Sequence, residues 1–249
     1  MKTSAVVFDF GGVMTTSTMP QRVIALSKEK GIDWNVFADG FNAHRLDYDA
    51  GRITLGEMYA LIWGDAGLSV SDETTAAFMK ADDESWCYRN ERTLEWMKAL
   101  KGRGFKIGIL TNMAPRFARE QFRPCFADFI ALADAMVISG DEGIVKPQRE
   151  IYDLLRSRIG LPAEELCFID DVEKNVNGSR AAGWNAIRFV TNDQVEADFE
   201  KFILGGVSSC GSSGRPTSRS CARAVPLQSL SGEASTSAYA ECPEESQSS

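Results

Sequence analysis

Short apolar runs alternate with amphipathic stretches along most of the chain. This alternation is typical of a parallel β-sheet whose strands are joined by helices. The apolar runs predict five strands, at residues 5–10, 106–111, 135–139, 166–170 and 186–190. The amphipathic stretches predict helices between them, at residues 91–102, 115–126, 148–159 and 173–182. The pattern therefore predicts an α/β fold with a doubly wound parallel sheet.

The segment between the first two predicted strands is far too long for a single crossover. It carries helix-like stretches of its own, at residues 21–29, 36–43, 55–66 and 72–80. We interpret residues 16–89 as an all-helical cap inserted into the sheet domain. The α/β core then comprises residues 1–15 and 90–204.

Residues 205–249 differ in composition from the rest of the chain. They are rich in Ser, with scattered Gly and Pro and few large apolar side chains. Such a segment buries too little apolar surface to offset the entropy lost on ordering. The sequence predicts a disordered tail.

The composition indicates a folded protein and argues against some kinds of partner. An apolar fraction of 44% is ample for a core, and the net charge of -8 opposes binding to nucleic acid or to an anionic membrane. A small metabolite is the expected partner. No apolar run reaches the roughly 18 residues of a membrane span, and no signal-peptide layout begins the chain, so we expect a cytoplasmic protein. The six cysteines form no CxxC pair, which favours free thiols.

Candidate chemistry lies where the predicted strands end, because open parallel sheets bind ligands beyond the carboxyl ends of their strands. Asp9 closes the first strand and is followed by Gly11 and Gly12, where the backbone can approach a ligand closely. Asp9 is a candidate nucleophile and metal ligand. The alternative is an aspartate that only caps the next turn.

The next two candidate positions suit an anion. Thr111 and Asn112 end the second strand just before a helix, so a hydroxyl and free N–H groups can bind phosphate there. The alternative is an ordinary helix cap. Lys146 precedes another helix and can act as a point charge on phosphate, unless it is a solvated surface lysine.

The fourth strand ends in the adjacent carboxylates Asp170 and Asp171. Two neighbouring carboxylates repel each other, and a hard cation such as Mg²⁺ bound between them would offset that repulsion. The alternative is a pair of aspartates that only caps the following helix. Asn175, one helical turn later, is positioned to orient the second carboxylate. Nucleophile, phosphate donors, cation and metal site together indicate phosphoryl transfer through an aspartyl-phosphate.

The motifs DFGGV, LTN, VKPQREIY and FIDDVEKN occur in this order, followed by AAGWNAI. Over roughly residues 4–204 the chain resembles the haloacid dehalogenase superfamily of hydrolases. The cap is similar to the small helical type of that family. The YDAGRIT stretch around Gly51 and Thr54 resembles the cap of phosphatases related to the N-terminal domain of soluble epoxide hydrolase.

The resemblance implies a role for each motif residue. Asp9 attacks phosphorus, Thr111 and Lys146 hold the transferring phosphoryl group, and Asn112 lines the same site. Asp170 and Asp171 help to hold Mg²⁺. The dehalogenase branch has Ser and Asn in place of the two aspartates and needs no metal, so the pair favours a phosphatase.

One position departs from the family pattern. Most phosphatases of the family carry an acid–base aspartate two residues after the nucleophile, where this chain has Gly11. The backbone carbonyl of Gly11 still matches the family's Mg²⁺ ligand. Loss of general acid–base assistance slows a reaction by roughly 10²- to 10⁴-fold. The only histidine, His44, and the aromatic Trp86 are expected to have surface or packing roles.

The predicted function is a Mg²⁺-dependent phosphomonoester hydrolase acting on a small phosphorylated metabolite. The alternatives are a catalytically weak module that binds phosphate compounds or a protein, and a dehalogenase-type hydrolase of the same fold.

Overall fold

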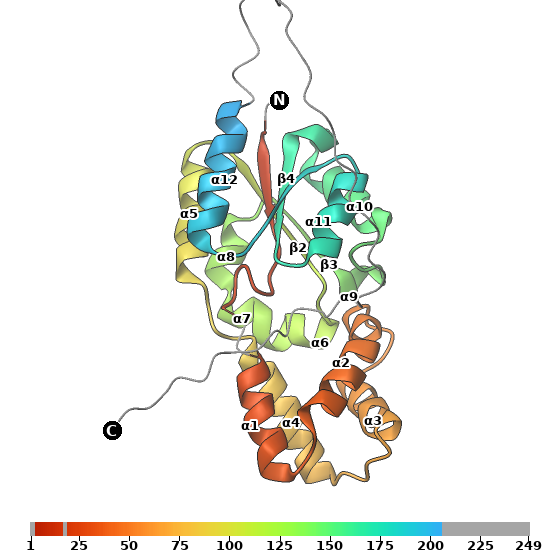
Figure 1. Cartoon of the computed structure of the whole chain (residues 1–249). Helices are drawn as coiled ribbons and strands as arrows, with labels where there is room; N and C mark the ends of the chain where they lie inside the picture. The colour runs from red at the N-terminus through yellow and green to blue at the C-terminus, as the bar shows by residue number, and fades with distance from the viewer. Residues whose placement is uncertain (1–2, 17–18, 206–249) are drawn as a thin grey trace, which may run out of the picture.

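The computed structural model describes residues 3–16 and 19–205, and it confirms the doubly wound α/β fold (Figure 1). A five-stranded, fully parallel sheet has the order β3-β2-β1-β4-β5. The strands are β1 (Ala5–Phe8), β2 (Lys106–Thr111), β3 (Ala135–Ile138), β4 (Leu166–Asp170) and β5 (Asn185–Arg188). Phe8 of the central strand lies level with Ile109 on one side and Ile169 on the other. The residues that follow these strands therefore reach the same edge of the sheet.

Helices cover both faces of the sheet (Figure 1). Val6 and Phe8 point into an apolar cluster shared with α5 (Glu91–Gly102), α8 (Ala127–Leu132) and α12 (Asn192–Gly205). Ala5 and Val7 point to the other face, which packs against α10 (Arg149–Ile159), with α11 (Glu173–Ala181) on the same side. Both faces of the central strand are thus buried, as its continuous apolar run predicts.

The sequence pattern gave no indication of α12. Its packing explains why it forms: the buried ring of Phe199 lies 5.8 Å from the ring of Trp96, whose other neighbour is Phe8 at 5.4 Å. Tertiary contact with the sheet face stabilises this helix, and a weak local pattern does not show such a contact.

The single helix expected at residues 115–126 is instead divided. It consists of α6 (Pro115–Phe117), the π-helical segment η1 (Ala118–Phe122) and α7 (Arg123–Cys125). Pro124 has no N–H group and cannot make the helical hydrogen bond to residue 120, so the regular ladder is interrupted there. Two further short segments are α9 (Ser139–Glu142) and the 3₁₀ turn η2 (Ala163–Glu165).

Four helices lie between β1 and α5: α1 (Met19–Lys30), α2 (Trp34–Asp49), α3 (Leu55–Asp65) and α4 (Asp72–Ser85). They enclose an aromatic cluster of their own that includes Phe37, Tyr59 and Phe78. Thr54 caps α3 in a capping box with Glu57.

Helix α2 runs six residues beyond its predicted end at residue 43. The added turn is stabilised by the ion pair between Arg45 and Asp49, four residues apart, and by burial of Tyr48.

The end of α2 rests directly on the sheet domain. The Ser139 hydroxyl donates to the Asp49 carbonyl at 2.6 Å. Gly51 has φ +70°, and a Cβ there would lie 3.0 Å from Pro115 and 3.1 Å from the Gly140 carbonyl. Only glycine fits this turn, so its identity holds the cap close to the strand ends.

The two connections between cap and sheet domain run side by side. Thr15 and Arg89 form an isolated antiparallel bridge. The domain boundaries at residues 15/16 and 89/90 stay predictions. Of the expected tail, residues 206–249 lie outside the described residues. Within the described part, no helix combines the length and apolar character of a bilayer span, and Cys87, Cys125 and Cys167 are free thiols.

Candidate active site

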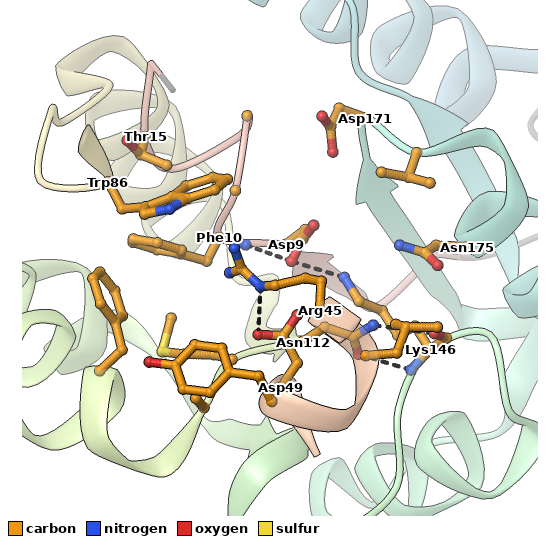
Figure 2. Close-up of a pocket in the computed structure, with 18 of the residues that line it drawn as sticks. Asp9, Phe10, Thr15, Arg45, Asp49, Trp86, Asn112, Lys146, Asp171 and Asn175 are labelled. Atoms are coloured by element: carbon orange, nitrogen blue, oxygen red, sulfur yellow. Dashed lines mark hydrogen bonds and ion pairs between the residues drawn. The ribbon is translucent and has the colours of Figure 1, made fainter. Parts of the chain in front are cut away.

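A cavity of about 600 Å³ lies between the carboxyl edge of the sheet and the cap (Figure 2). Asp9, Asn112, Lys146, Asp171 and Asn175, all expected at the site, line it from the core. The cavity is enclosed by cap residues from α2 and from the end of α4. The structure thus brings most of the sequence-predicted residues together around one space.

Lys146 lies at the centre of the charged groups. Its side chain is 1% exposed, and its Nζ is 2.7 Å from both Asp9 Oδ1 and Asp170 Oδ2. Burial opposes the charged amine, but the two carboxylates outweigh it and raise the lysine pKa above its ordinary value. The alternative of a solvated surface lysine is therefore wrong.

Asn112 holds Lys146 in place through its backbone. Its Nδ2 donates to the Lys146 carbonyl at 3.0 Å, and its Oδ1 accepts from the Lys146 N–H at 2.7 Å. Thr111 behaves differently from its neighbour: it is buried, its hydroxyl donates to the Asn112 carbonyl at 3.4 Å, and it is not among the described residues that line the cavity. Its proposed contact with phosphate stays a prediction.

Three carboxylates converge beside Lys146. Asp9, Asp170 and Asp171 each offer an oxygen within 4.8 Å of the others. Burial is the main cause that raises the pKa of Asp9 well above its ordinary value, and Lys146 offsets it only in part. Burial, and then the charge of Asp170, raise the pKa of Asp171 to about 6. Such a cluster favours a bound cation, and carboxylate oxygens are the donors that Mg²⁺ prefers.

The two adjacent aspartates have different environments. Asp170 is fully buried and accepts hydrogen bonds from Lys146, from the Val172 N–H at 2.8 Å and from Asn175 Nδ2 at 3.2 Å to both oxygens. The expectation that Asn175 orients the second carboxylate is thus wrong, because its amide reaches back to the first. We infer that Asp170 positions Lys146.

Asp171 lies against the turn that follows β1. A Cβ at Gly12, whose φ is +70°, would lie 2.5 Å from Asp171 Oδ2. Any side chain at position 12 would therefore displace this carboxylate. The second glycine of DFGGV gives Asp171 its place beside Asp9.

Gly11 is covered by an aromatic ring from the cap. A Cβ at Gly11 would lie 3.2 Å from Cζ3 of Trp86, and the indole Nε1–H of Trp86 donates to Asp82 Oδ1 at 3.0 Å. Trp86 lines the cavity, so its role is not limited to hinge packing. The space that an acid–base aspartate needs is partly occupied by this ring.

We expect Gly11→Asp to lower the melting temperature and to yield little activity while Trp86 is present. With Trp86→Leu as background, the aspartate fits and should raise turnover of a short alkyl phosphate, relative to an aryl phosphate, by about 10- to 10³-fold. Gly64→Asp, with open space around its Cβ, is the control for the added charge. A stable and more active single variant would show that the ring does not restrict position 11.

The cap contributes residues that the sequence reasoning did not single out. Arg45 and Asp49 of α2 face Asp9 and Lys146 across the cavity (Figure 2), with Arg45 Nε 2.8 Å from Asp49 Oδ1. The helical spacing of Phe41, Arg45, Tyr48 and Asp49 places them on one face of α2, which is the signal that could have identified them. His44 points elsewhere: its Nε2 lies 2.7 Å from Asp65 Oδ2.

Residues 3–183 match the family of haloacid dehalogenase-like hydrolases. The chain belongs to this family of hydrolases, as its motifs predict. A sesquiterpene phosphatase, astK, from Aspergillus oryzae is 29% identical over 181 residues, which cover 72% of this chain and 86% of that protein. Bifunctional epoxide hydrolase 2 from Sus scrofa is 25% identical over 224 residues, 81% of this chain but 39% of that protein.

Solved structures share the fold. A HAD family enzyme from Bacteroides thetaiotaomicron in complex with magnesium has a TM-score of 0.61 and 20% identity, covering 81% of this chain and 100% of that chain. The same enzyme with magnesium and inorganic phosphate has a TM-score of 0.58 and 19% identity, over 76% and 96% of the two chains.

Proposed function

We propose that this hydrolase is a Mg²⁺-dependent phosphomonoesterase that acts on a small phosphorylated metabolite through an aspartyl-phosphate. The observation that carries the proposal is the buried Lys146, which bridges Asp9 and Asp170 while Asp171 lies beside them. A nucleophile, a fixed cation and a carboxylate cluster thus share one cavity.

Asp9 is the nucleophile in this proposal. One of its oxygens forms the bond to phosphorus as the ester P–O bond breaks, and the leaving oxygen takes a proton from water to give the alcohol. Water then cleaves the acyl phosphate, which releases inorganic phosphate and restores the carboxylate. Lys146 keeps Asp9 oriented through its 2.7 Å contact and presents positive charge to the phosphoryl oxygens.

Mg²⁺ fits the donor set of Asp9, Asp170, Asp171 and the Gly11 carbonyl, and when bound it would neutralise charge on the phosphoryl oxygens. Asp171 is the carboxylate of the adjacent pair that lies on the cavity lining, whereas Asp170 is fully buried behind it.

The relatives support phosphatase chemistry. The Aspergillus oryzae protein is named a sesquiterpene phosphatase, and a phosphoserine phosphatase from Thermus thermophilus is 31% identical over 86 residues, 34% of each chain. We carry over only the reaction on phosphate esters from these names.

An assay with a generic aryl phosphate tests this function. We expect release of phosphate that requires Mg²⁺ and stops with a chelator. Hydrolysis that is indifferent to chelator would contradict the metal assignment, and no hydrolysis would favour a binding module or dehalogenase-type chemistry.

Asp171→Asn should raise the Mg²⁺ concentration that gives half-maximal activity by at least about tenfold, with partial recovery at high Mg²⁺, because a carboxylate is removed from a hard-cation site. Titration of activity with Mg²⁺ measures this shift. Asp193→Asn, on an 84% exposed side chain, is the matched control. An unchanged Mg²⁺ requirement in the Asp171 variant would remove Asp171 from the metal site.

A further inference from the structure

The wall of the cavity opposite the charged floor is largely aromatic. Phe41 and Tyr48 of α2, Trp86 after α4, and Met113 and Phe117 of the core all line the space. Each of them except Trp86 is buried. This surface is available to the group that is attached to the phosphoryl group.

The charged side chains of the cap wall are paired with one another. Arg45 Nε contacts Asp49, and its guanidinium lies over the rings of Phe41, Tyr48 and Trp86 at 5.1 to 5.9 Å. The arginine therefore forms part of the aromatic wall.

The two remaining acids of this wall also have partners. Asp83 accepts from Arg116 Nη2 at 2.6 and 2.7 Å, and Asp82 accepts from Trp86 Nε1. Asp49, Asp82 and Asp83 outnumber the two arginines that pair with them, Arg45 and Arg116, so a second anionic group of the substrate would be repelled next to this wall.

The ring of Trp86 also lies where the leaving group begins. It covers Gly11, two residues after Asp9, and it is fixed there by the hydrogen bond to Asp82. An aromatic surface thus lies at position 11, where most phosphatases of the family have a carboxylate beside the leaving group.

We infer that the substrate is the monophosphate of an uncharged, mainly hydrocarbon alcohol, whose chain packs on Trp86, Phe41 and Phe117. This inference rests on the proposed phosphomonoesterase function. A cavity of about 600 Å³ is within the usual range for small-molecule sites, and its polar floor and aromatic wall suit a molecule with one phosphate end and one apolar end.

The test compares kcat/KM for n-alkyl phosphates of increasing length with that for glycerol 3-phosphate and phosphoserine, all with Mg²⁺. We expect kcat/KM to rise about two- to fourfold per methylene until the cavity is filled, since each buried methylene favours binding by about that factor. Phosphoserine, which carries a carboxylate and an amine, should be the poorest substrate. A preference for either polar ester over the octyl ester would overturn the inference.

Substitutions in the aromatic wall test whether these side chains cause the preference for long alkyl chains. Trp86→Ala should lower the ratio of octyl to glycerol phosphate kcat/KM by about tenfold or more, whereas Trp86→Phe should retain most of it. If Trp86→Ala melts below the assay temperature, the same ratio is measured for Phe117→Ala. Leu61→Ala, on an exposed cap residue, is the control. An unchanged ratio in both alanine variants would contradict the assigned wall.

The outcomes separate the two claims. If no phosphate ester is hydrolysed with Mg²⁺, including an aryl phosphate, the proposed function fails. If the aryl phosphate is hydrolysed but chain length has no effect, only the assignment of the substrate class fails.

Discussion

Replacement of Asp9 by asparagine is expected to lower kcat by at least about three orders of magnitude while the fold is retained. The amide keeps the shape of the side chain and an oxygen that can accept from the Phe10 N–H, now 2.7 Å from Asp9 Oδ1. It is, however, a poor nucleophile toward phosphorus. Lys146 keeps Asp170 as its counter-charge in this variant, and burial disfavours charge at position 9, so the loss of stability should be smaller than that caused by removing the lysine.

The measurement is kcat with the aryl phosphate at saturating Mg²⁺, with a melting curve for each protein. Asp193→Asn is again the matched change of charge at an exposed position. If the Asp9 variant keeps more than a small fraction of wild-type kcat, another group performs the attack.

Lys146→Met should produce a large loss of both activity and stability. The substitution keeps the length of the aliphatic chain but leaves Asp9 and Asp170 buried without their shared cation. Removing one partner of a buried ion pair typically costs about 3–5 kcal/mol in the free energy of unfolding. Added Mg²⁺ should recover part of that stability, because a cation in the carboxylate cluster offsets the same repulsion.

Chemical denaturation with and without Mg²⁺ measures the free energy of unfolding. Lys98→Met, at an exposed lysine paired with Glu95, is the control and should change it by less than about 1 kcal/mol. A Lys146 variant that is as stable as the control and still active would show that the bridge between the carboxylates is dispensable.

The sequence was sufficient to predict the sheet and the floor of the site. Asp9 and Asn112 directly follow β1 and β2, and Asp170 ends β4; these strands are parallel neighbours, so the side chains at their carboxyl ends converge by topology. A parallel sheet brings the carboxyl ends of its strands to one edge, so a motif at the end of each predicted strand was enough to place these residues in one site.

The remaining features depend on contacts between distant segments. The Trp86 ring over Gly11 and the stabilisation of α12 by Phe199 each join distant residues through packing. The hydrogen bond from Asn175 to Asp170 is local, but the sequence does not show which of the two aspartates the amide reaches. Periodicity shows which face of a helix is apolar, but it does not show which neighbour that face meets. The contacts of Arg45 with the aromatic rings of the wall are likewise not visible in the sequence pattern.

Acid-quenched mass spectrometry of the enzyme during turnover of an aryl phosphate with Mg²⁺ tests the aspartyl-phosphate most directly. We expect a peptide that contains Asp9 and carries the mass of one phosphoryl group; the added mass should be lost on treatment with hydroxylamine and be absent in Asp9→Asn. Turnover without any phosphoryl adduct on that peptide, or an adduct on a different residue, would contradict Asp9 as the covalent nucleophile.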